Sequence, residues 1–224
     1  MYLIALHRRW LFPLIWLILI TPLTPKLDLE IEHYFFEDHH FSNNAFFTFL
    51  YNYGCWPTLA FFGFILFAFV ATFFYEKLKK WRNPFLILTL SFVLGTGLVV
   101  HVILKDHWGR PRPKQVVEFG GEQNFRPYYS PNFFHQPEPS KSFPCGHCSM
   151  GFYFFSLAIL GKRISSKYLM QTGFALAFSL GVLLSISRMA QGGHFFSDTL
   201  LSAYIMWTAA LICDWIIYEK KYIC

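Results

Sequence analysis

The feature that most constrains this chain is the length of its apolar runs. A helix needs about 17 to 25 predominantly apolar residues to cross the hydrocarbon core of a bilayer, because every backbone polar group must bond within the segment. Four runs meet this requirement and two shorter ones approach it. They occupy residues 10–23, 56–75, 84–104, 148–161, 168–186 and 199–218. Since only 14% of the 224 residues are charged, the sequence predicts an all-α integral membrane protein, a six-transmembrane-helix bundle.

The first apolar run, residues 10–23, leaves an alternative open. Arg8 and Arg9 precede it, an arrangement that secretory signal peptides share. Residues 21–26 offer no small-residue cleavage site, so a retained first span is the favoured interpretation. No repeat or linker separates the runs, and a single membrane-embedded domain over residues 1–224 is expected.

Between the first two runs, residues 24–55 combine acidic and aromatic side chains. We expect this segment to be a long non-cytoplasmic loop containing a helix that aromatic side chains anchor at the level of the lipid headgroups. The alternative is that the segment forms a platform that admits a lipid substrate.

The distribution of Lys and Arg predicts the orientation. Positively charged residues gather in the cytoplasmic loops of membrane proteins. Most of the 19 in this chain fall on one side of the predicted spans: Arg8, Arg9, Lys77, Lys79, Lys80, Arg82, Lys162, Arg163, Lys167, Lys220 and Lys221. Both termini are therefore predicted to be cytoplasmic, and the opposite loops to face the periplasm of a bacterial inner membrane. These loops and a phosphate site account for the net charge of +6, so neither a nucleic-acid partner nor an obligate protein partner is expected.

Three clusters of reactive residues lie at span ends on the predicted outer side. The first runs from Lys105 to Pro113, the second ends at His147, and the third extends from Ser187 to Asp198. A charge costs about 2.5 to 3.5 kcal/mol at the centre of a membrane helix, so ionisable groups at span ends indicate function. The order of the spans brings all three clusters to one face of the membrane.

The cations in these clusters suit a phosphate group. Arg112 and Arg188 each offer a planar fork that matches two phosphate oxygens, and Lys105 adds a point charge. Three such cations would stabilise the charge on the equatorial oxygens during phosphoryl transfer.

The histidines and the acid supply the reactive groups. Asp198 follows His194 by four residues, so on one helix face the carboxylate can hold one nitrogen of the imidazole while the other attacks. We assign His194 as the nucleophile and Asp198 as its orienting acid. His147 is assigned as the general acid that protonates the leaving oxygen and then deprotonates the attacking water.

The spacing of these residues resembles the signature of the type 2 phosphatidic acid phosphatase superfamily. The matching motifs are Lys105 followed after six residues by Arg112-Pro113, Pro-x-Gly-His ending at His147, and Ser187-Arg188 followed by His194 and Asp198. The resemblance implies six helices, no metal and no cofactor, with the backbone around Gly146 joining Lys105, Arg112 and Arg188 as phosphate ligands. It covers the second half of the chain.

One position departs from the family pattern. Cys145 stands where the family usually has a serine whose hydroxyl binds the phosphate, and a thiol is a weaker donor. We expect Cys145 and Gly146 to hold the phosphate mainly through backbone amides, because helix N-termini bind anions.

Cys145-Gly-His-Cys148 is also the tetrapeptide of disulfide isomerases. Pro144 before it, the absence of a β-α-β pattern and the apolar run after it argue against a redox enzyme. A structural disulfide between Cys145 and Cys148, which would constrain His147, is the other alternative.

Further motifs look similar to bacterial lipid A 4′-phosphatases: the nonapeptide from Lys105 to Pro113, Glu118-Phe-Gly-Gly, and Arg188-Met-Ala-Gln-Gly-Gly-His-Phe-Phe-Ser-Asp. The expected reaction is hydrolysis of a phosphate monoester on a membrane lipid, most of all the 4′-phosphate of lipid A. Three further cations could hold other parts of the headgroup or could be solvated loop charges: Arg110, Lys114 and Arg126. Removal of phosphate from phosphatidylglycerol phosphate or undecaprenyl diphosphate, and phosphate transfer between lipids, stay open. A catalytically silent lipid binder and a vanadate-dependent haloperoxidase are less favoured.

Overall fold

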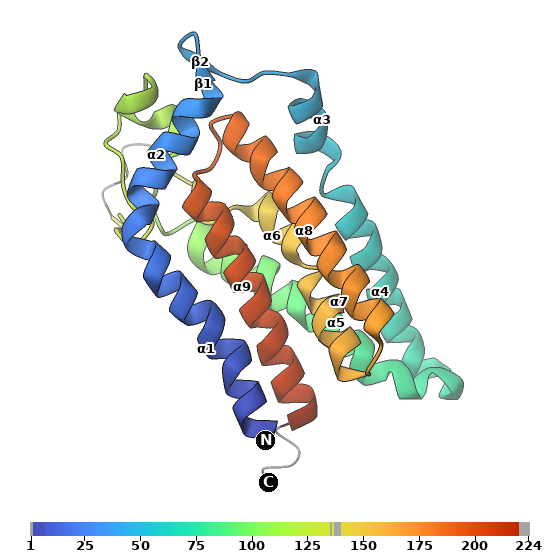
Figure 1. Cartoon of the computed structure of the whole chain (residues 1–224). Coiled ribbons are helices and arrows are strands. Elements are labelled where there is room, and N and C mark those ends of the chain that lie inside the picture. The colour runs from blue at the N-terminus through green and yellow to red at the C-terminus, as the bar shows by residue number, and fades with distance from the viewer. Residues whose placement is uncertain (1, 135, 137–139, 220–224) are drawn as a thin grey trace.

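The computed structural model describes residues 2–134, 136 and 140–219, and most of them are helical (Figure 1). Lys220 and Lys221, part of the predicted cytoplasmic charge, lie outside the described residues. The main helices are α1 (Tyr2–Ile20), α2 (Thr24–Phe35), α3 (Ala45–Tyr53), α4 (Trp56–Phe74), α5 (Arg82–Ser91), α6 (Gly146–Phe152), α7 (Phe155–Arg163), α8 (Lys167–Ala190) and α9 (Phe196–Asp214).

Shorter elements connect and extend these helices. Two π-helical stretches continue α5 and α9: η3 (Phe92–Lys105) and η6 (Trp215–Glu219). The 3-10 turns are η1 (Thr21–Leu23), η2 (Glu76–Trp81), η4 (Pro113–Gln115) and η5 (Val117–Phe119). Strands β1 (Phe36–Glu37) and β2 (His40–Phe41) form an antiparallel hairpin after α2, with Phe36 opposite Phe41.

Within the described part of the chain, five helical stretches are long and apolar enough to cross a membrane: Trp10–Phe35, Ala45–Phe74, Glu76–Lys105, Lys167–Ala190 and Phe196–Tyr218. Each matches one predicted span, and only Tyr75 of the span 56–75 falls outside its stretch. The remaining prediction, residues 148–161, falls on α6 and α7, which a turn at Tyr153 and Phe154 separates. Residues 146–163 together would extend about 27 Å at 1.5 Å per residue. That this pair forms a sixth span stays a prediction.

The expectation of a long outer loop over residues 24–55 is wrong for most of its length. After η1 the chain turns helical again as α2, because prolines such as Pro22 and Pro25 are tolerated in a first helical turn. Asp28 and Glu32 on α2 are completely buried, so this helix packs on the bundle. Similarly, α3 leads directly into α4.

The centre of the bundle is the α6–α7 pair, in which every residue from Gly151 to Gly161 is buried. Small residues allow α8 to approach it closely. A Cβ on Gly151 would lie 2.6 Å from Cα of Gly181, and one on Gly173 would lie 2.3 Å from the backbone nitrogen of Ala158. This close packing, typical of membrane helices, fixes the start of α6 relative to the end of α8.

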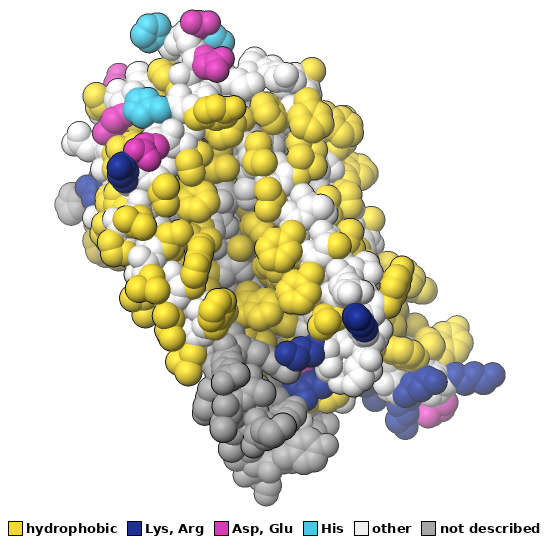
Figure 2. All heavy atoms as spheres, viewed as in Figure 1, with side chains coloured by type: hydrophobic (Ala, Val, Ile, Leu, Met, Phe, Trp, Pro, Cys, Tyr) yellow, Lys and Arg dark blue, Asp and Glu magenta, His cyan; other side chains and the backbone are white. Residues whose placement is uncertain are grey.

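The ends of several elements meet at one end of the bundle. There η3 ends, α6 begins, α8 ends and α9 begins, with α3 and the β1–β2 hairpin at the same end (Figure 1). Most of the Lys and Arg side chains visible in Figure 2 gather at the opposite end, while apolar side chains cover the surface between the two ends.

Candidate functional site

His194 and Asp198 lie side by side where α9 begins. His194 is 1% exposed, and its Nδ1 is 3.7 Å from Oδ2 of Asp198, longer than a hydrogen bond. Nδ1 has no hydrogen-bond partner among the described residues. Burial is the main cause that lowers the pKa of His194 to about 3. The imidazole is therefore neutral at physiological pH and keeps the lone pair that a nucleophile needs.

Asp198 is held by a buried network that the sequence did not indicate. One guanidinium nitrogen of Arg110 pairs with Oδ1 of Asp198, and the Ser142 hydroxyl donates to Oδ2. The backbone N–H of Phe195 also donates to Oδ2, at 2.9 Å. Asp198 accepts at both oxygens, so its position beside His194 is fixed by three other residues.

Arg110 links Asp198 to α2. Its Nη2 donates to Oδ2 of Asp28 at 2.7 Å, and both side chains are fully buried. Burial opposes the charge of Arg110, but Asp198 and Asp28 outweigh it and the pKa of Arg110 is raised. The interpretation of Arg110 as a headgroup ligand is therefore wrong, because a side chain enclosed by two carboxylates has no access to a substrate. Arg126, also considered for that role, offers its backbone carbonyl to Nε of Arg110.

Arg112 and Arg188 line an open pocket of about 480 Å³. Lys114, at the same pocket, is exposed. The Nε atoms of both Arg112 and Arg188 are buried without a hydrogen-bond partner among the described residues. Two unpaired guanidinium donors at a cationic pocket are suited to an oxyanion. A Cβ at Gly193 would lie 2.1 Å from Nη2 of Arg188, so glycine lets the backbone pass this close to the guanidinium.

Lys105 lies beside the start of α6. A Cβ on Gly146 would be 3.4 Å from Nζ of Lys105 and 2.8 Å from Nε2 of His101. The other ring nitrogen of His101 is 2.7 Å from the carbonyl oxygen of Thr96. His101 therefore presents a ring nitrogen toward the backbone that the family signature assigns to phosphate binding.

His147 contacts Tyr51 of α3. The two rings are stacked with centroids 5.0 Å apart, and Nε2 of His147 lies 3.2 Å from the carbonyl oxygen of Tyr51. Burial, together with the charge of Arg188, lowers the pKa of His147 to about 4. Tyr51, His101 and Asp28 could not be recognised from the sequence, because none of them belongs to a motif with a characteristic spacing.

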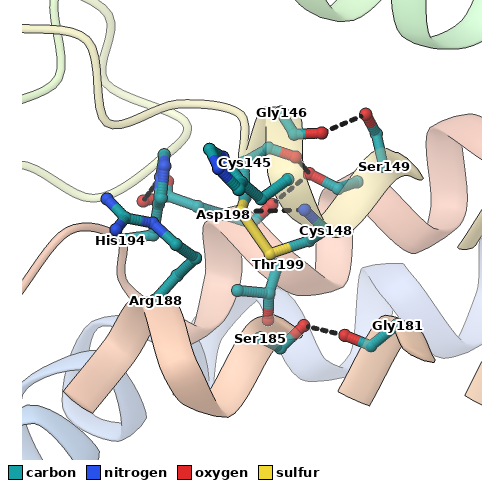
Figure 3. Close-up of a disulfide and its surroundings, with 12 residues drawn as sticks. Cys145, Gly146, Cys148, Ser149, Gly181, Ser185, Arg188, His194, Asp198 and Thr199 are labelled. Carbon is teal, nitrogen blue, oxygen red and sulfur yellow. Dashed lines mark hydrogen bonds and ion pairs between the residues drawn. A yellow bond between two sulfur atoms is a disulfide. The ribbon is translucent and has the colours of Figure 1, made fainter. Parts of the chain in front are cut away.

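Cys145 and Cys148 form a disulfide that joins the residue before α6 to its first turn (Figure 3). The structure therefore contains the disulfide that the sequence left open as an alternative, and Cys145 has no S–H group to donate to a phosphate. Phosphate binding by the backbone amides around Cys145 and Gly146 stays a prediction. Both half-cystines are completely buried, which disfavours the thiol exchange of a redox enzyme. Figure 3 also shows Arg188, His194 and Asp198 gathered beside this disulfide.

This geometry can be compared with known proteins. The sequence pattern of the PAP2 superfamily matches residues 85–222. The chain belongs to the PAP2 superfamily. The family predicted from the spaced motifs is thus confirmed, and with it the assignment as a phosphoric monoester hydrolase. Its apolar helices and its membrane-lipid phosphatase relatives make it a multi-pass membrane protein.

Three curated relatives bear the name lipid A 4′-phosphatase. The protein of Francisella tularensis subsp. novicida is 30% identical over 224 residues, which cover 98% of this chain and 95% of that protein. The Rhizobium leguminosarum protein is 29% identical over 63% of this chain and 55% of its own length. The Rhizobium etli protein is 30% identical over 54% of this chain and 44% of its own length. No solved structure matches the chain.

The Francisella relative extends the likeness beyond the PAP2 region. Its match includes the N-terminal third of this chain, where Asp28 and Tyr51 lie. Among the described residues, no group of three or more His, Cys, Asp or Glu is placed to hold a metal ion. A metal-free reaction stays a prediction.

Proposed function

We propose that this PAP2 enzyme removes the 4′-phosphate from lipid A at the periplasmic face of a bacterial inner membrane, through a phosphohistidine intermediate on His194. The observation that carries the proposal is the match to the Francisella lipid A 4′-phosphatase along nearly the whole of both chains. Relatives that share only the PAP2 signature would match only the second half.

The first chemical step would form a bond between His194 and phosphorus. Nε2 of His194 attacks, because Nδ1 is the nitrogen on the Asp198 side. The bond from phosphorus to the sugar oxygen breaks. His147, protonated when the negative charge of the bound phosphate raises its pKa again, gives that oxygen a proton. Lys105, Arg112 and Arg188 stabilise the charge on the equatorial oxygens. The 3.7 Å separation between His194 and Asp198 is expected to shorten as the imidazole gains positive charge.

The second step would release the phosphate. His147, now neutral, takes a proton from a water molecule whose oxygen attacks phosphorus. The bond to Nε2 breaks, inorganic phosphate leaves, and both histidines return to their starting state. The amides at the start of α6 support this step by binding phosphate oxygens.

The pocket supports a bulky anionic headgroup. It carries three cations, and no carboxylate is among the described residues that line it: His40, Phe41, Ser42, Asn43, Tyr51, Arg112, Lys114, Arg188 and Gln191. Lys114 lies in η4, two residues after Arg112, and is available for a second anionic group of the substrate.

The charge distribution supports the periplasmic orientation. The Lys and Arg side chains around η2 and the start of α8 lie at the end of the bundle opposite the site (Figure 2). The positive-inside rule assigns that end to the cytoplasm, together with the start of α1 and the end of α9. The α6–α7 pair would then be the sixth span, returning the chain from Gly146 at the site to Arg163 at the cytoplasmic end.

Phosphate release by the purified protein tests the substrate. Lipid A, phosphatidylglycerol phosphate and undecaprenyl diphosphate are supplied in detergent, with chelator and without added metal. We expect release from lipid A, with loss of the 4′-phosphate from the product. His194→Ala should abolish it. His107→Ala should retain it, since the His107 side chain is exposed and its ring lies against the Ile103 carbonyl of the preceding helix η3.

The other outcomes discriminate between the alternatives. Phosphate release only from another lipid would refute lipid A as the substrate but would leave the assignment as a lipid phosphatase intact. Labelled phosphate that appears on a second lipid would identify a phosphotransferase. Full activity in His194→Ala would refute the phosphohistidine mechanism.

A further inference from the structure

Tyr51 contacts two residues of the proposed site although it lies outside the region that matches the PAP2 superfamily. We propose that Tyr51 is a positioning residue: its ring orients Arg188 and His147, and its backbone carbonyl selects the nitrogen of His147 that carries the catalytic proton. This inference rests on the roles proposed above for Arg188 and His147.

The ring of Tyr51 joins the phosphate ligand to the acid. The guanidinium carbon of Arg188 lies 4.6 Å from the centre of the ring, within cation–π range. The His147 ring stacks on the same tyrosine with an interplanar angle of 16°. A single rigid side chain therefore restrains the two groups that must act on opposite ends of the bond from phosphorus to the leaving oxygen.

The carbonyl of Tyr51 determines the tautomer of His147. A carbonyl oxygen only accepts, so the bond at 3.2 Å requires that Nε2 of His147 carries a hydrogen. In the neutral imidazole, Nδ1 then has the lone pair. Nδ1 is consequently the atom that loses a proton to the leaving oxygen and takes one from water. Tyr51 orients His147 as Asp198 is proposed to orient His194.

Helix α3 is held firmly enough for this task. The Ser187 hydroxyl, next to Arg188, donates to the carbonyl of Phe47 on α3 at 3.2 Å. Before α3, the backbone N–H of Ser42 donates to the carbonyl of Ala190 at the end of α8. After α3, a Cβ on Gly54 would lie 2.5 Å from a methyl carbon of Leu184. The helix that carries Tyr51 thus contacts α8 at several points.

The exposure of Tyr51 argues against a role in the core. The side chain is 44% exposed and lines the cationic pocket. An aromatic ring at such a position contributes little burial, so its replacement is expected to affect stability weakly. Tyr53 on the same helix is 52% exposed, and its ring contacts Phe49 and Trp56. It serves as a matched control.

The test compares Tyr51→Leu, Tyr51→Phe and Tyr53→Leu with the parent protein on a small soluble phosphate monoester, with inorganic phosphate as the inhibitor. For Tyr51→Leu we expect the inhibition constant of phosphate to rise about 10-fold, equivalent to about 1.4 kcal/mol, and kcat to fall. The pH profile of kcat should also shift to higher pH, because water reaches His147. Tyr51→Phe should behave as the parent, since it keeps the ring and the carbonyl.

Three results would overturn the inference. In the first, Tyr51→Leu matches Tyr53→Leu in the inhibition constant, kcat and pH profile. In the second, Tyr51→Phe is impaired as much as Tyr51→Leu, which would assign the effect to the hydroxyl. In the third, His194→Ala keeps the parent rate, which would refute both the proposed active site and this inference. If Tyr51→Leu does not fold, Tyr51→Gln replaces it as a second variant without the ring, and the same comparisons apply.

Discussion

Replacing Asp28 by asparagine tests whether the buried contact between Asp28 and Arg110 stabilises the packing of α2 against the site. Three hydrogen bonds of 2.7 Å reach Asp28: from Nη2 of Arg110 and the Ser197 hydroxyl to Oδ2, and from the Ser197 backbone N–H to Oδ1. Asparagine has nearly the same size but a single acceptor oxygen. Whichever way the amide turns, its NH₂ group meets a donor in a site that is completely buried.

The expected cost follows from these contacts. A buried donor left without a partner costs about 1 to 3 kcal/mol, and a hydrogen bond to a charged group contributes about 1.5 to 3 kcal/mol, part of which is lost with the charge. The free energy of unfolding should therefore fall by about 3 kcal/mol. For a chain of this length the midpoint of thermal unfolding falls by about 2 to 4 °C per kcal/mol, so a decrease of about 6 to 12 °C is expected.

Thermal unfolding in detergent, followed by tryptophan fluorescence, measures this change. The matched control is Glu30→Gln on the same helix. Glu30 forms an exposed pair with Lys26 at 3.6 Å, so this substitution should shift the midpoint by less than about 2 °C. The rate of Asp28→Asn should fall less than the rate of Asp198→Asn, because Asp28 acts on His194 only through Arg110 and Asp198. A midpoint of Asp28→Asn equal to that of Glu30→Gln would refute the reasoning.

Three further predictions concern single residues. Gly193→Ala should displace the Arg188 guanidinium and lower kcat/KM about 10² to 10³-fold. The control is Gly63→Ala, whose added Cβ meets nothing within 4 Å. Equal kcat/KM values for the two variants would refute the close contact between Gly193 and Arg188. Because the pKa of His194 is lowered to about 3 in the folded protein, the histidine of the unfolded chain binds a proton at higher pH than that of the folded chain. The free energy of unfolding should therefore fall by about 1.6 kcal/mol between pH 6.5 and pH 5. In His194→Asn this part of the loss should be absent in denaturant titrations, and an unchanged pH dependence would count against a buried neutral imidazole. Lys114→Ala should raise KM for lipid A while leaving kcat on a small phosphate monoester unchanged. An unchanged KM for lipid A would show that Lys114 does not bind the substrate.

The sequence predicted correctly those features that depend on residues close together in the chain. The length of an apolar run depends only on neighbouring residues, so five stretches that can cross a membrane match five of the predicted spans. The spacing of Lys105, Arg112, His194 and Asp198 likewise sufficed for the family, because each motif lies within one short segment.

The sequence was uninformative where distant residues determine the environment. In the sequence Arg110 resembles a solvated loop cation. It becomes a buried ion-pair partner only because Asp28, 82 positions earlier, and Asp198, 88 positions later, approach it in the fold. Cys145 could be a thiol donor or a half-cystine until α6 is folded. Residues 24–55 have the mixed polarity of an interfacial loop, but Asp28 and Glu32 are buried because α2 packs on the bundle, which no property of α2 alone indicates.

The burial of α6 and α7 has a consequence for assembly in the membrane. A segment enclosed by protein from Gly151 to Gly161 has no face selected for contact with lipid. Neither α6, with 7 residues, nor α7, with 9 residues, is long enough to cross the bilayer alone, so the pair is poorly suited to enter it before its neighbours do. We expect α8 and α9 to insert first and to receive this pair afterwards. The start of α6, which carries His147, would then arrive last, so that a partly inserted chain has its cations and its nucleophile in the membrane but no phosphatase activity.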